Sequence, residues 1–277
     1  MSSKAVLDRI VDDFQSAAPG RGVIVYLEGK TDPPVLLALL GAIDADETAN
    51  GVLHDGVLIR SLGGSEEVEQ RIEVARKAGV VGVFGVLDGD GRGLNEVAMQ
   101  FDAPYPGPQF RWKGYCIENL LARAGWPPAW GVEPDWRAEM ASYAPYVALN
   151  RLGSELRGRM KRLDLDGYLR PDRSRPLRQP EEFTEMFRDG KHELANLDVD
   201  AMFSKEYAAV GHTIEQSLDG AHTLIDGKWL INDLAPRRTG FSQERCREDW
   251  TVHVRAAGGD PEICAWWRRA VAPYRTG

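Results

Sequence analysis

The stretch VIVYLEGKTD, residues Val23–Asp32, decides the expected fold. Its first five residues are apolar, β-branched or aromatic and are bounded by glycines, which predicts a buried strand at Val23–Leu27. A helix should follow over Val35–Ile43, because two prolines suit a first helical turn and apolar residues then recur at helical spacing.

Two further strands extend this pattern. They are predicted over Gly56–Leu62 and over the almost continuous apolar run Val80–Leu87, with a helix between them that begins at Ser65 and is ended by Gly79. A fourth strand is expected around Trp112–Ile117. Strands that alternate with helices imply right-handed crossovers, so we expect an α/β fold with a mostly parallel sheet and flanking helices.

Beyond about residue 120 the pattern becomes helical. The predicted helices are Trp136–Lys161, Pro180–Leu197, Ser204–Leu218 and Phe241–Ala257. Gly125–Pro134, which is rich in Trp and Pro, is predicted to be a linker, and Arg170–Pro180 a loop. We therefore expect an α/β domain over residues 1–124 and a mainly helical C-terminal half over residues 125–277.

The composition is that of a soluble globular protein, with 43% hydrophobic and 27% charged residues in 277. No apolar run reaches the roughly 18 residues of a membrane span, and no signal-peptide core follows the first residues, so we expect a cytoplasmic protein without membrane contact. The three cysteines form no C-x-x-C pair and the five histidines no local ligand pair. Oxygen ligands would therefore have to hold any metal, which favours magnesium, calcium or manganese.

Charge is unevenly distributed along the chain, whose net charge is −8. The stretch Arg151–Arg178 has nine basic and four acidic residues, against 11 basic and 18 acidic residues over Met1–Leu120. The basic stretch is either a solvated helix and loop or a surface for nucleic-acid phosphates. The candidate phosphate contacts are Arg157, Arg159, Lys161 and Arg162.

Two acidic motifs follow predicted strands. Glu28 and Asp32 come after the first strand, and Asp88 and Asp90 after the third. Ligand sites of open α/β sheets lie outside the carboxyl ends of the strands, so these side chains converge if the two strands are neighbours. Two carboxylates ~4 Å apart repel by about 1 kcal/mol in water and by about 4 kcal/mol at an effective dielectric of 20. One or two Mg²⁺ or Mn²⁺ ions would relieve that repulsion.

The motifs resemble the Toprim domain, the catalytic unit of topoisomerases, bacterial primases and several nucleases. Ile117-Glu118-Asn119 is similar to a segment of OLD-family nucleases and of a Toprim family that is paired with ABC-type ATPases in anti-phage defence. Gly227-Lys228 resembles the segment that follows in those families, which implies a return to the Toprim core near residues 221–234. The resemblance covers Gly22–Leu121 and matches nothing over Trp126–Ala221.

The resemblance implies a metal-dependent endonuclease that hydrolyses phosphodiester bonds in DNA or RNA as an effector of anti-phage defence. It further implies an ABC-type ATPase partner and a homodimer. Glu28 would be a general base or a metal ligand, and Lys228 would stabilise charge on the phosphate. The metal ligands would be Glu28, Asp32, Asp88, Asp90 and Glu118.

Alternative functions stay open. The Toprim unit could be a non-catalytic binding subunit of an ATPase complex, or the chain could be an RNA-maturation nuclease. An EF-hand is excluded, because Arg92 and Met99 stand where its loop needs Asp or Asn and Glu. Arg92 also departs from the haloacid-dehalogenase phosphatase pattern, and the glycine spacings of dinucleotide-binding and Walker A loops are missing.

Overall fold

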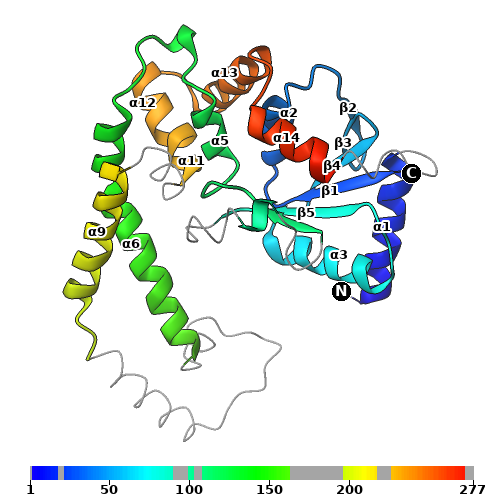
Figure 1. The fold of residues 1–277 in the computed structure, drawn as a ribbon, viewed down its shortest axis with the longest axis horizontal. Coiled ribbons are helices and arrows are strands. Elements are labelled where there is room, and N and C mark those ends of the chain that lie inside the picture. Colours follow the sequence, from blue (N-terminus) through cyan, green and yellow to red (C-terminus); the bar gives the residue numbers. More distant parts are fainter. Residues whose placement is uncertain are drawn as a thin grey trace, which may run out of the picture. The chain divides into compact units, whose positions relative to one another are not determined.

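The computed structural model describes residues 2–17, 22–89, 99–102, 108–162, 196–216 and 226–271 (Figure 1). The strands, in chain order, are β1 (Val23–Leu27), β2 (Asp46–Thr48), β3 (Gly51–His54), β4 (Val57–Ser61), β5 (Val83–Leu87) and β6 (Gln109–Arg111). The helical elements are α1 (Ser3–Ala17), α2 (Asp32–Leu39), α3 (Ser65–Lys77), α5 (Glu118–Arg123), η1 (Pro128–Trp130), α6 (Trp136–Arg162), α9 (Val199–Gln216), α11 (Gly227–Trp229), η2 (Leu230–Leu234), α12 (Ala235–Thr239), α13 (Gln243–Ala256) and α14 (Pro261–Ala270).

The strands form one six-stranded sheet in the order β2-β3-β4-β1-β5-β6. β1 is parallel to both of its neighbours, β4 and β5, and β6 continues the parallel part beyond β5. β2 and β3 are antiparallel and lie at the other edge. The predicted α/β class with a mostly parallel sheet is therefore confirmed, and the first and third predicted strands are neighbours.

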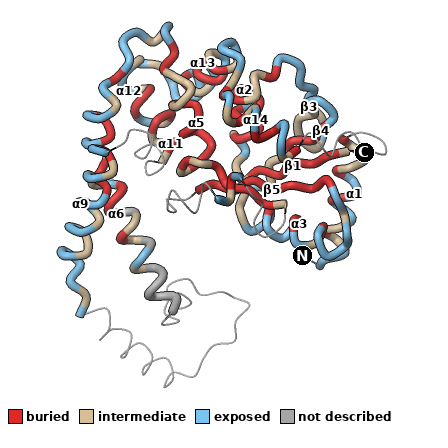
Figure 2. The backbone as a smooth tube through the Cα atoms, in the orientation of Figure 1, coloured by how far each residue is buried: buried red, intermediate tan, exposed pale blue. Residues whose placement is uncertain are grey.

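The sheet is buried between two layers of helices, and β1 is buried along its whole length (Figure 2). α1 and α3 cover one face, where Ile10 and Ile72 pack with Tyr26 of β1. On the other face Trp266 of α14 stacks on Phe101, with ring centroids 5.8 Å apart. Burial on both faces explains why the parallel strands are almost uniformly apolar.

Three of the predicted strands are confirmed and the fourth is wrong. Val23–Leu27 is β1, and the ranges Gly56–Leu62 and Val80–Leu87 contain β4 and β5. The strand nearest to the predicted range Trp112–Ile117 is β6, which ends just before that range begins. The chain instead turns at Gly114, where a Cβ would lie 2.7 Å from Cβ of Asn119, and then enters α5.

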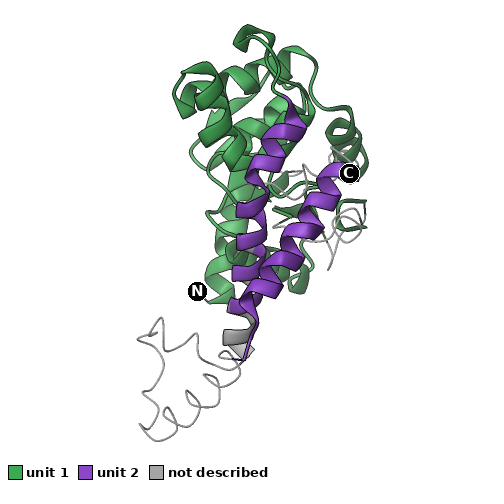
Figure 3. Ribbon diagram, turned by 90° about the vertical axis from the view of Figure 1, so that its left-hand side faces the viewer, with its two compact units in different colours: residues 1–134, 222–277 green, residues 135–221 purple. Residues whose placement is uncertain are grey.

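Residues 1–134 and 222–277 form one compact unit that contains the sheet, and residues 135–221 form a second (Figure 3). In the second unit α6 packs against α9, and Arg151 forms an ion pair of 3.6 Å with Glu206. The first unit runs past the predicted boundary at residue 124, because the Trp126 and Trp250 rings pack together and Trp250 Nε1 donates to the Gly125 carbonyl. The predicted loop Arg170–Pro180 and nearly all of Pro180–Leu197 lie outside the described residues.

The described helices include none that is both long and apolar enough to cross a bilayer.

Candidate functional site

The carboxyl ends of β1 and β5 bring the first two predicted site residues together. Glu28 directly follows β1 and Asp88 directly follows β5, and these strands are paired. Glu28 Oε1 accepts a hydrogen bond of 2.7 Å from the Asp88 main-chain N–H. Two acids that are 60 positions apart in the chain are thus in direct contact at one end of the sheet.

Asp32 joins them from the first turn of α2. Its side chain is only 4% exposed, and its Oδ2 accepts a 2.7 Å hydrogen bond from the Gly29 N–H. A Cβ at Gly29 would collide with the same carboxylate, so a larger residue at this position would displace the Asp32 side chain. The loop between β1 and α2 therefore folds the Asp32 side chain back toward the strand end.

Glu118 enters the site at the beginning of α5. The residue is 1% exposed, and its Oε2 is buried with no hydrogen-bond partner among the described residues. Oδ1 of Asp88 is likewise buried and has no hydrogen-bond partner among the described residues. A buried carboxylate oxygen without a partner loses hydration and gains no hydrogen bond in return. Two such oxygens on acids that repel one another would be stabilised by a cation.

The segment 226–228 returns to the site from the far end of the chain. Gly227 packs against the start of α5, where a Cβ would lie 2.6 Å from the Asn119 nitrogen and 2.9 Å from Sγ of Cys116. Asp226 Oδ1 accepts a hydrogen bond from the Lys228 N–H at 2.9 Å and caps α11. The Lys228 side chain is exposed at the rim of the carboxylates.

The electrostatics of the site are those of crowded, buried acids. Burial, followed by repulsion from Asp32, Glu28 and Glu118, raises the pKa of Asp88 to about 8. Burial also raises the pKa of Asp32 to about 7, although the Gly29 hydrogen bond opposes the change. Both carboxyls therefore keep a proton well above the pH at which an exposed aspartate loses it.

The same carboxylates favour the charged form of Lys228, whereas they disfavour the charged form of one another. Partial burial alone would lower the pKa of its ammonium group. The nearby Asp88 and Glu118 carboxylates outweigh that effect, so the pKa is raised. The ammonium group stays charged and partly compensates the negative site.

The donor set fits a divalent cation that prefers oxygen, because Asp88 and Glu118 each present a buried oxygen with no hydrogen-bond partner in the described part of the chain. As placed, no three His, Cys, Asp or Glu side chains of the described residues are arranged as ligands of a single ion. Asp90, which the sequence places in this set, lies outside the described residues.

The predicted phosphate contacts belong to the second unit. Arg157, Arg159, Lys161 and Arg162 are in the last turns of α6, where their side chains lie outside the described residues. Sequence reasoning also missed Arg111, a buried arginine on β6 whose NH1 donates to the Asp88 carbonyl at 2.7 Å. No motif marks this residue, because its partner is a main-chain atom.

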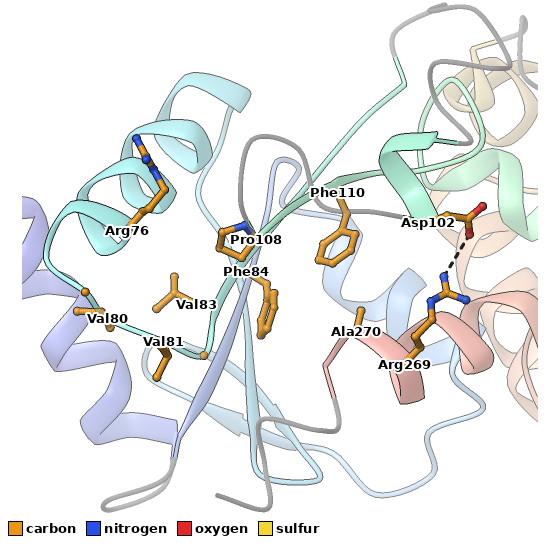
Figure 4. Close-up of a pocket in the computed structure, with 12 residues that line it drawn as sticks. Arg76, Val80, Val81, Val83, Phe84, Asp102, Pro108, Phe110, Arg269 and Ala270 are labelled. Carbon is orange, nitrogen blue, oxygen red and sulfur yellow. Dashed lines mark hydrogen bonds and ion pairs between the residues drawn. The ribbon is translucent and has the colours of Figure 1, made fainter.

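A separate cavity of about 560 Å³ lies near the amino end of β5 (Figure 4). Phe84 and Phe110 line it, and Arg269 forms an ion pair of 3.2 Å with Asp102 at its edge. None of the carboxylates described above lines this cavity.

Comparisons of the chain with models of protein families, with curated proteins and with solved structures find no significant match.

Proposed function

We propose that this protein is a metal-dependent nuclease with a Toprim-like catalytic unit, which hydrolyses phosphodiester bonds in DNA or RNA. One observation carries the proposal. Four acids from three segments gather at the carboxyl ends of parallel strands, three of them buried and one half-buried, and two of their oxygens have no partner among the described residues. The acids are Glu28, Asp32, Asp88 and Glu118. Structural burial alone gives no reason to gather like charges in this way.

The residues suited to hold a metal ion are Asp88 and Glu118, through their unpartnered oxygens, with Asp32 near both. Asp90, two positions after Asp88 in the chain, is the remaining candidate of the sequence motif. Mg²⁺ or Mn²⁺ bound there would polarise a phosphoryl oxygen and activate a water molecule. Asp32 and Asp88 hold protons near neutral pH, so they must release them when a cation binds.

Glu28 and Lys228 take different parts in this proposal. One oxygen of Glu28 accepts a hydrogen bond from the Asp88 main chain, and the ionised carboxylate would act as the general base or bind the metal ion, which a glutamine cannot do. The ammonium group of Lys228 lies at the exposed rim, where it can bind a phosphate of the substrate and offset negative charge that develops on it.

Cleavage assays on the purified protein test the proposal. Supercoiled plasmid, single-stranded DNA and RNA should be cut with Mg²⁺ or Mn²⁺ and left intact with EDTA. Glu28→Gln should lower the rate by about 10²-fold or more, as expected when a group that activates or orients the reacting atoms is lost. Glu67→Gln, at an exposed position of α3, is the matched control and should keep the full rate. Equal rates for wild type and Glu28→Gln would contradict the proposal.

The role in anti-phage defence, the ABC-type ATPase partner and the homodimer belong to the same proposal and rest on the resemblance at residues 117–119 and 227–228. An effector that depends on its ATPase for activation would not cut alone, so the assay is repeated with an ATPase encoded beside this chain. Binding of Mn²⁺ without any cleavage would favour the non-catalytic binding subunit. Cleavage confined to structured precursor RNA would favour the maturation nuclease.

A further inference from the structure

Asp88 is held by its main chain on both sides. Its N–H donates to Glu28 Oε1 at 2.7 Å, and its carbonyl accepts from NH1 of Arg111 at the same distance. These two contacts fix the peptide groups on either side of the residue. When both peptide planes are fixed, the direction of the Cα–Cβ bond is fixed as well. The backbone thereby sets the direction in which the Asp88 side chain leaves the main chain. Oδ1 of this side chain has no hydrogen-bond partner among the described residues, so it can bind another group.

The arginine is well placed for this task. Arg111 is 7% exposed and lies on β6 opposite Leu87, the residue that precedes Asp88. Its NH2 lies 3.8 Å from a carboxylate oxygen of Glu69, which helps to set the plane of the guanidinium group. A guanidinium donates through a rigid planar fork, so a bond from it constrains direction more than one from a flexible lysine.

The turn beyond Asp88 is packed just as tightly. A Cβ at Gly89 would collide with the Gly114 carbonyl and lie 3.3 Å from that of Trp112. The Trp112 N–H in turn donates to the Leu87 carbonyl at 3.0 Å. The β6 segment therefore supports the end of β5 through both its side chain and its backbone.

We propose that Arg111 is a positioning residue of the carboxylate site: its bond to the Asp88 carbonyl holds that carboxylate in the orientation in which it binds a divalent cation. This inference rests on the proposed metal site. Groups that orient metal ligands without touching the metal typically contribute roughly 10- to 100-fold to metal affinity.

The test measures Mn²⁺ affinity by calorimetry on the full chain, with circular dichroism of each variant as the check on folding. Arg111→Met should bind Mn²⁺ about 10-fold or more weakly than wild type. Arg111→Lys, which keeps the charge and one donor, should recover part of that loss. The matched control is Arg71→Lys, another buried arginine, whose partner is Asp13; it should lose stability and keep its Mn²⁺ affinity within about two-fold.

The outcomes separate the two proposals. Folded Arg111 variants that bind Mn²⁺ within about two-fold of wild type would overturn the positioning role and leave the metal site standing. A wild type that binds no Mn²⁺ would overturn both. If Arg111→Met does not fold, the comparison between Arg111→Lys and Arg71→Lys decides, since both replace a buried guanidinium by an ammonium group.

Discussion

Replacing Asp88 by asparagine should make the metal-free protein more stable at neutral and basic pH. Burial and three neighbouring acids raise the pKa of this carboxyl from its ordinary 3.8 to about 8. The folded state therefore keeps a proton that the unfolded state has already lost over the range between those two values. Asparagine has nearly the same shape and cannot ionise, so the variant folds without having to take up that proton.

The sign and size follow from proton linkage. A carboxyl with a raised folded-state pKa stabilises the fold fully below its ordinary pKa, and this contribution is lost as the pH rises toward about 8. One extra proton on the folded state changes the free energy of unfolding by about 1.4 kcal/mol per pH unit. Between about pH 5 and pH 7 the wild type should thus lose about 2.7 kcal/mol more than Asp88→Asn does.

The assay is urea unfolding in EDTA at several pH values from about 5 to about 8, followed by tryptophan fluorescence. Seven of the eight tryptophans belong to the unit that contains the sheet, so the signal reports on the unit that holds the site. Asp8→Asn, at an exposed position of α1, controls for the loss of one negative charge and should keep the wild-type slope. If the curves for wild type and Asp88→Asn run parallel, Asp88 does not carry a strongly raised pKa and its neighbours do not repel its charge.

Three other changes test separate parts of the molecule. Gly227→Ala places a methyl group 2.6 Å from a main-chain nitrogen of α5, so it should cost about 1–3 kcal/mol in thermal unfolding and reduce nuclease activity by displacing Lys228. Asp13→Ala leaves two arginines without their buried partner and should cost about 3–5 kcal/mol in urea unfolding, whereas a loss under about 1 kcal/mol would contradict a structural role. Reversing three basic charges on α6 should weaken nucleic-acid binding and flatten its salt dependence in anisotropy titrations, and unchanged slopes would return this stretch to a solvated surface. The reversed residues are Arg157, Arg159 and Arg162.

The centre of the fold was predictable because its strands are buried on both faces. Such strands are continuous apolar runs, and β1, β4 and β5 stand out in the sequence for that reason. Once β1 and β5 are known to be parallel neighbours, the meeting of Glu28 and Asp88 follows from topology alone.

The edges of the sheet were not predicted, because their strands are short and have at most two apolar residues each. β2 and β3 have few apolar residues, although Asp55-Gly56 after β3 is a typical two-residue hairpin signal, and both residues have a positive φ of 52° and 77°. β6 has three residues, two of which are Gln109 and Arg111. The burial of these two polar residues depends on partners that are distant in the sequence. The local pattern of apolar residues does not reveal such partners.

The fold contains a direct comparison that bears on why the carboxylate site exists. Asp13 is completely buried, but Tyr26 Oη donates to its Oδ2 at 2.7 Å, Arg71 lies 3.0 Å from the same oxygen, and Arg60 pairs with Oδ1. The same chain therefore supplies a full set of partners to one buried aspartate and leaves Oδ1 of Asp88 without one in the described residues. Since the fold is able to satisfy a buried carboxylate, the unsatisfied site is not explained by stability. The cost of this buried acid is accounted for if the missing partner is a cation that binds after folding. Replacing Asp88 by asparagine should therefore stabilise the metal-free protein and weaken cation binding together.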